Sequence, residues 1–163
     1  MRLLVFLHGT VLMHPSALGR SREERVAQVR AGVDPSVHDY GAYVPVGDAV
    51  AKLRRWQRQG ARIDYLSSHR DPDGVAADEQ VLRRHGLPSG RVLARRPGQS
   101  YGDLAARERP DVLIEDDCQS IGPDQLTYPQ IRADLRGRIK SIVVPEFGGI
   151  DHLPDGLQDL LAV

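Results

Sequence analysis

Leu3-Leu4-Val5-Phe6-Leu7-His8-Gly9-Thr10-Val11-Leu12 is the most informative stretch of this chain. Its apolar run of five residues ends at a His-Gly-Thr turn, which is typical of a buried strand in a parallel sheet. In open α/β sheets, the loops that follow the carboxyl ends of the strands form the binding sites. The stretch therefore predicts an α/β fold with a functional site at the end of its first strand.

Length and charge limit the class of protein. The chain has 163 residues, of which 40% are hydrophobic, so we expect a single domain over residues 1–163 with a full core. Lysine and arginine together number 22, as do aspartate and glutamate, which makes the formal net charge zero. No basic excess would attract nucleic acid or an anionic membrane, so neither is expected as a partner.

The single cysteine, Cys118, excludes an internal disulfide and leaves no thiol cluster for a structural zinc site. We interpret it as a small buried thiol. The start of the chain shows no small-residue cleavage site, and no apolar stretch approaches the ~18 residues that a membrane span needs. A cytoplasmic location is expected.

Strand and helix signals alternate along the rest of the chain. Ser21 and Glu24 have the spacing of a capping box, Gly32 would end that helix, and Asp48 would cap the next one. The expected helices are 21–31, 49–59, 71–84 and 100–107, and the expected further strands are 61–66, 91–94, 112–114 and 141–144. Such alternation predicts right-handed crossovers and a parallel sheet. The turn-rich residues 34–47 are expected to form an ordered loop or small flap.

The segment Gly9-Thr10-Val11 resembles the end of the first motif of the haloacid dehalogenase (HAD) superfamily, an apolar strand followed by Asp-x-Asp-Gly-Thr and then Leu or Val. In that family the first Asp is the phosphoryl-accepting nucleophile and a magnesium ligand, and the second is a general acid/base. The alignment places Phe6 at the nucleophile and His8 at the acid/base. The resemblance implies a HAD-like Rossmannoid three-layer sandwich with a minimal cap and a parallel sheet of about five strands in the order 3-2-1-4-5.

Two further strand ends match the family. Ser67 occupies the place of the second-motif hydroxyl, which binds a phosphoryl oxygen, although serine is also ordinary turn chemistry. Glu115, Asp116 and Asp117 follow an apolar strand, as do the metal-holding acids of the fourth motif. Adjacent carboxylates repel one another unless a cation, a helix N-terminus or solvent compensates, and a solvated acidic loop is the alternative interpretation.

The cation of the third motif has no clear counterpart. The two lysines of the chain, Lys52 and Lys140, lie outside the expected stretch, where Arg95 or Arg96 could substitute. A softer ion could use His8 with the two aspartates, and Ser67, His8 and Asp117 could form a serine-histidine-carboxylate arrangement.

The resemblance thus implies a site at one edge of the sheet, where His8, Ser67 and Asp117 should lie about one small-ligand width apart. The expected catalytic residues are His8 and Asp117. The expected phosphate-binding residues are Gly9, Thr10, Ser67, Ser68 and Arg95, and the expected metal ligands are Asp116 and Asp117. Mg²⁺ could still bind, but more weakly, because the first-motif Asp is missing.

From these residues we expect a catalytically impaired, phosphatase-like domain that binds a phosphate-bearing ligand or a protein partner. The alternative is an active HAD-type phosphohydrolase or other hydrolase that uses His8 with Asp116 and Asp117. Residues 14–47 have room for only a helix and a loop, so the site should be open or covered by another subunit. Its rim would be Tyr40, Tyr43 and Pro45, which could also serve as a homodimer contact.

Overall fold

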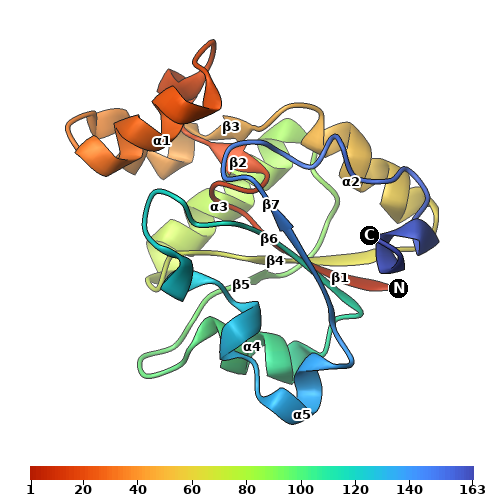
Figure 1. Cartoon of the computed structure of the whole chain (residues 1–163). Helices are drawn as coiled ribbons and strands as arrows, with labels where there is room; N and C mark the ends of the chain where they lie inside the picture. The colour runs from red at the N-terminus through yellow and green to blue at the C-terminus, as the bar shows by residue number, and fades with distance from the viewer.

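The computed structural model describes residues 1–163 and is built around a five-stranded parallel sheet with helices on both faces (Figure 1). Its strands are β1 (Arg2–Phe6), β4 (Arg62–Leu66), β5 (Val92–Leu93), β6 (Val112–Asp116) and β7 (Lys140–Val144). They lie side by side in the order β5-β4-β1-β6-β7, and every neighbouring pair is parallel.

The labels of Figure 1 include two strands outside this sheet. These are β2 (Leu12–Met13) and β3 (Val44–Pro45), which form a separate antiparallel pair. Counted along the chain, the five strands of the main sheet alone therefore follow the order 3-2-1-4-5. The order places β1 in the centre, between β4 and β6, so the ends of these three strands meet at one edge.

Helices cover both faces of the sheet because successive strand residues point to opposite sides. Leu3 and Val5 pack with residues of α2 (Ala49–Arg58) and α3 (Pro72–His85) in the larger core. Leu4, between them, packs with residues of α4 (Tyr101–Glu108), and α5 (Ala133–Arg136) lies on the same side (Figure 1). The sheet is therefore the middle layer of three.

Several helix ends follow the sequence signals. The Ser21 side chain and Glu24 form a capping box at the start of α1 (Arg22–Ala31), and Gly32 ends this helix in the left-handed conformation with φ 62°. Asp48 was expected to cap α2, and this prediction is wrong. Its side chain makes no capping hydrogen bond, and its backbone N–H instead donates to the Asp151 carboxylate, which lies beyond β7.

A small flap lies between β2 and β3, and it takes in the expected helix 21–31 together with most of the loop or flap expected at 34–47. It contains α1 and the short 3-10 turns η1 (Pro15–Ala17), η2 (Pro35–His38) and η3 (Tyr40–Ala42). Val26 of α1 packs with Met13, Val46 and Phe147 in a separate small core. The flap is thereby attached at the carboxyl end of the sheet. No helix in the structure combines the length and the apolar character that crossing a membrane requires.

We predict that Gly90→Ala destabilises the protein by ~1–3 kcal/mol, as overpacking typically does. A Cβ atom at this position would overlap the backbone carbonyl oxygen of Ile63 in β4, which cannot move without disturbing the sheet. Gly137→Ala is the matched control, because a Cβ there meets no atom within 4 Å. Urea denaturation measures both variants, and equal midpoints would contradict the packing described here.

Candidate functional site

Three carboxylates meet where β6 and β7 end, and we call them the carboxylate cluster: Asp116, Asp117 and Glu146. Each can offer one oxygen, and these oxygens all lie within 4.8 Å of one another. The arrangement follows from strand register, since Asp116 of β6 pairs with Val144 of β7 and both strands end at the same edge of the sheet. An all-oxygen set of this kind suits a hard cation such as Mg²⁺.

Asp116 is the buried member of the carboxylate cluster, with 4% of its surface exposed. The Thr10 hydroxyl donates to one of its oxygens at 2.8 Å, and the Cys118 N–H donates to the other at 3.0 Å. Burial, reinforced by the nearby Glu146 charge, raises the pKa of Asp116 to about 6 although these hydrogen bonds oppose the shift. Ionised Asp116 is therefore costly without a cation.

The other two members have partners of their own. The Ser120 N–H and hydroxyl both donate to Glu146 at 2.6 Å. Arg22 of α1 donates to Asp117 at 2.9 Å and also to the Glu146 backbone carbonyl. The alternative of a solvated acidic loop therefore does not describe these residues. Arg22 already compensates part of the charge that a cation would neutralise.

Backbone strain accompanies this cluster. Cys118 and Phe147 have positive φ angles of 49° and 59°, which are uncommon for residues other than glycine. The Phe147 N–H donates to the Gly9 carbonyl at 2.7 Å, so the loop after β7 is tied to the turn after β1. Such conformations persist where the surrounding structure holds them, often at functional sites.

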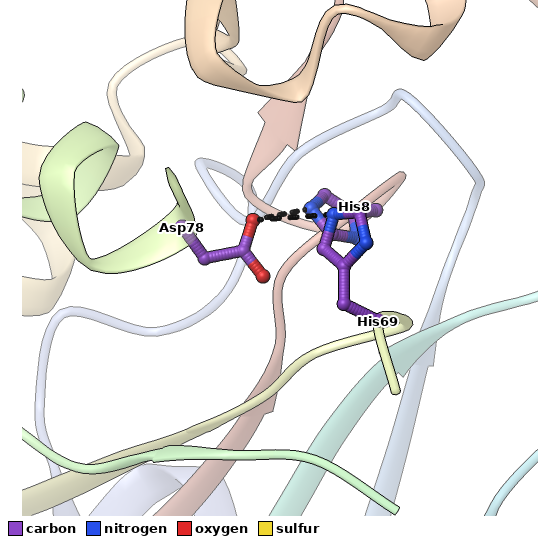
Figure 2. Close-up of side chains that lie close together, drawn as sticks. All are labelled: His8, His69 and Asp78. Carbon is purple, nitrogen blue, oxygen red and sulfur yellow. Dashed lines mark hydrogen bonds and ion pairs between the residues drawn. The ribbon is translucent and has the colours of Figure 1, made fainter. Parts of the chain in front are cut away.

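A second group of side chains lies at the ends of β1 and β4, and we call it the histidine cluster: His8, His69 and Asp78 (Figure 2). His8 follows β1, His69 lies in the turn after β4, and Asp78 projects from α3. His8 Nε2 lies 2.9 Å from Asp78 Oδ1, and His69 Nε2 lies 3.8 Å from the same oxygen. Asp78 is completely buried.

Two serines complete the hydrogen bonding of the histidine cluster. His8 Nδ1 lies 2.5 Å from Ser68 Oγ, and the Ser67 hydroxyl donates to Asp78 Oδ2 at 2.5 Å. The ring of Tyr40 packs edge-on against His69 with centroids 4.2 Å apart. Burial lowers the pKa of His69, although the Asp78 charge opposes this shift. His69 is consequently neutral at physiological pH.

The structure divides the predicted site residues between the two clusters. Thr10, Asp116 and Asp117 meet at the carboxylate cluster, whereas His8, Ser67 and Ser68 meet at the histidine cluster. No hydrogen bond or ion pair joins His8 to Asp116 or Asp117, because both of its nitrogens face Ser68 and Asp78. The alternative Ser67-His8-Asp117 arrangement is not formed. A chain through Ser68, His8 and Asp78 is present instead.

Phe6, which the resemblance aligns with the nucleophile of the HAD motif, takes part in a third contact at this edge. Its ring lies edge-on to Tyr101 with centroids 5.0 Å apart. The Arg95 guanidinium stacks over the Tyr101 ring, with Cζ 3.7 Å from the ring centre. Arg95 Nε is buried and has no hydrogen-bond partner. The predicted phosphate-binding arginine is thus one aromatic ring away from Phe6.

Three residues of these clusters were missed by the sequence reasoning: His69, Asp78 and Glu146. Asp78 precedes the buried Val81 and Leu82 by three and four residues, so helical spacing places it on the core face of α3. Glu146 follows an apolar strand, β7, as Asp116 ends β6. These signals could have indicated both acids. The contact of His69 with Asp78 had no such signal.

Comparisons with known proteins identify the fold and no closer relationship. No protein-family model matches the chain, and no curated protein matches its sequence. A structure of the class C acid phosphatase from Bacillus anthracis is similar with a TM-score of 0.59 and 14% identity, covering 99% of this chain and 77% of that one. A structure of the same enzyme with tungstate bound is similar with a TM-score of 0.56 and 16% identity, covering 91% of this chain and 68% of that one.

A structure of the Pnkp1/Rnl/Hen1 complex is also similar, with a TM-score of 0.56 and 15% identity. The match covers 89% of this chain but only 46% of that one. Together with the strand order, these similarities define the class of fold. It is an α/β, HAD-like Rossmannoid fold that this chain shares with class C acid phosphatases.

We predict that Asp116→Asn stabilises the protein at pH 7.5 in the presence of a chelator. The pKa of Asp116 is about 6 in the folded state, against 3.8 for an unperturbed aspartate. The contribution of this carboxyl to the free energy of unfolding is therefore complete below pH 3.8 and is lost as pH rises through 6, whereas Asn has no such loss. Because one pKa unit corresponds to ~1.4 kcal/mol, the gain of the variant over wild type should grow by ~2.4 kcal/mol between pH 4 and 7.5.

Urea denaturation at several pH values measures this difference in unfolding free energy. Asp124→Asn, which removes a carboxylate from the surface, is the control for the loss of one charge. A difference between Asp116→Asn and wild type that stays constant with pH would contradict the assigned burial of this carboxylate.

Proposed function

We propose that this protein is a phosphatase-like HAD domain that binds a phosphate-bearing ligand and has lost most or all turnover. The observation that carries the proposal is the side chain at position 6. Phe6 is packed on Tyr101, and it offers neither an oxygen nucleophile nor a metal ligand. Phosphoryl transfer by the family's route needs both an oxygen nucleophile and a positioned cation.

Retention of the carboxylate cluster supports ligand binding. Asp116, Asp117 and Glu146 supply oxygen atoms close enough to share one ion, and their chemistry fits Mg²⁺. A bound Mg²⁺ would neutralise charge on a phosphate group. The missing carboxylate at position 6 and the Arg22–Asp117 ion pair both weaken such a site.

Arg95 supports recognition of the anion. Its stacking on Tyr101 fixes the guanidinium plane. The buried Nε has no hydrogen-bond acceptor in the protein, and a phosphate oxygen could serve as one. The hydroxyls of Ser67 and Ser68 are already used by Asp78 and His8. The Thr10 hydroxyl is likewise used, by Asp116. We therefore assign phosphate binding to Arg95 before these hydroxyls.

A working hydrolase is the second candidate, and one observation favours it. Ser68 Oγ, the His8 imidazole and the Asp78 carboxylate form a continuous chain, with distances of 2.5 and 2.9 Å. In such a chain a histidine can accept the serine proton while the carboxylate orients the ring. Loss of any hydrolytic activity in Ser68→Ala, with unchanged stability, would identify this second function.

We predict that Phe6→Asp gains Mg²⁺ affinity and some phosphatase turnover. The new carboxylate would add an oxygen ligand and a nucleophile at the position where the family has both. Phe6→Asn is the matched control, because it makes the same change in shape without the charge. Isothermal titration with Mg²⁺ and hydrolysis of p-nitrophenyl phosphate measure the outcome, and wild type should show no turnover above background.

The loss of the Phe6 ring should cost ~3 kcal/mol, so thermal unfolding is measured first. A further change of His8→Asp would place a second carboxylate beside the buried Asp78 and should destabilise the protein more. A folded Phe6→Asp protein with the Mg²⁺ affinity of Phe6→Asn would show that position 6 does not face the carboxylate cluster.

We also predict that inorganic phosphate with Mg²⁺ raises the melting temperature of the wild-type protein. A ligand at 100 times its Kd stabilises the folded state by ~2.7 kcal/mol. Arg95→Gln should remove most of this shift, whereas Arg96→Gln, at the exposed neighbouring residue, should retain it. Differential scanning fluorimetry measures both. Absence of a shift in wild type would instead favour a protein partner at this edge.

A further inference from the structure

His69 has a buried nitrogen that no protein group satisfies. Its Nε2 atom makes no hydrogen bond, and it points toward Asp78 Oδ1 from 3.8 Å, beyond hydrogen-bonding distance (Figure 2). His8 Nε2 approaches the same oxygen from 2.9 Å. Buried polar atoms nearly always have a partner, so an orphan atom beside two potential ligands calls for an explanation.

We propose that His8, His69 and Asp78 form a binding site for one Zn²⁺ ion or a similar transition metal. Their three ligand atoms lie within 4.8 Å of one another. In a tetrahedral site with zinc–nitrogen bonds of 2.0–2.1 Å, neighbouring ligand atoms are separated by about 3.3 Å. The observed 2.9 and 3.8 Å lie on either side of that value. Small side-chain rotations would therefore complete the site.

Neighbouring groups already hold the ligands in place. Ser67 donates to the Asp78 oxygen that would not bind the metal, and Ser68 can accept from His8 Nδ1, which leaves the Nε2 lone pair free for an ion. The His69 ring lies against Gly74 of α3, where a Cβ atom would be 2.5 Å from its Cγ and Nδ1. The absence of a side chain at Gly74 makes room for the ligand.

The ligands of the histidine cluster favour a different metal ion than the oxygen ligands of the carboxylate cluster do. Two imidazoles and one carboxylate favour Zn²⁺ over Mg²⁺, and three protein ligands leave a fourth position for water or an anion. The side chains of His8 and His69 are only 11% and 12% exposed, and Tyr40 of the flap covers His69. A bound ion would thus link the ends of β1 and β4 to α3 beneath the flap.

Metal binding and the hydrolytic chain make opposite demands on His8. The chain needs a proton on Nε2 for Asp78 and a lone pair on Nδ1 for Ser68, whereas the metal needs the reverse. One ring cannot satisfy both at once. A bound metal would therefore exclude the serine chemistry described above.

The test is titration of the metal-stripped, full-length protein with Co²⁺, which reports its geometry through visible absorption, followed by displacement with Zn²⁺. We expect one ion per chain with the intense bands of four-coordinate Co²⁺, which an ion in the six-coordinate, all-oxygen carboxylate cluster would not give, and loss of these bands when Zn²⁺ is added. His69→Ala should weaken Co²⁺ binding at least 100-fold and abolish the bands. His152→Ala, which removes an exposed histidine, should leave both unchanged.

Gly74→Ala provides a variant that keeps all three ligands. Its methyl group should displace the His69 ring and weaken binding at least tenfold, with folding checked by circular dichroism. Asp116→Asn should keep the intense four-coordinate bands of wild type, because it belongs to the other cluster. Absent bands in wild type, equal affinity in folded Gly74→Ala, or loss of the four-coordinate bands in Asp116→Asn would each overturn the proposal.

Discussion

The close approach of the Gly9 turn to Asp116 is the contact on which the rest of this edge depends. Gly9 has a φ of 83°, and a Cβ atom there would lie 2.8 Å from Asp116 Oδ2. The absence of a side chain lets Thr10 donate to this carboxylate and lets the Gly9 carbonyl accept from Phe147. One turn thereby joins the ends of β1 and β6 to the loop after β7.

This turn also separates two kinds of chemistry. His8 precedes Gly9 and faces α3, whereas Thr10 follows Gly9 and faces the carboxylate cluster. The first cluster offers imidazole and carboxylate ligands, and the second offers oxygen alone. In the resembled motif the positions of Phe6 and His8 both carry acids, so a single site would be expected. Phe6 and His8 divide that edge into separate parts.

A shared fold does not by itself carry the activity of a phosphatase to this chain. The neighbours at TM-scores of 0.56–0.59 share the overall fold with this chain. Chemistry depends on individual side chains at the strand ends, and there Phe6 contacts Tyr101 in place of a metal or substrate.

Much of the architecture could be predicted from the sequence because its causes are local. Apolar runs, the Ser21–Glu24 capping box and the Gly32 stop depend on residues close together in the chain, and the structure confirms them. The strand order came from the resemblance carried by Gly9-Thr10-Val11 and is also found. The flap was expected, although its pairing of β2 with β3 was not, since each strand has only two residues.

The partners of His8 were decided by tertiary structure alone. Sequence reasoning placed Asp117 beside this histidine, because both follow strands that end at one edge. The packing of α3 instead brings Asp78, 70 residues away in the chain, to 2.9 Å from it, while Arg22 of α1 pairs with Asp117. Local sequence determines that a buried strand ends in a polar turn. Which charge that turn meets depends on how distant helices pack against the sheet.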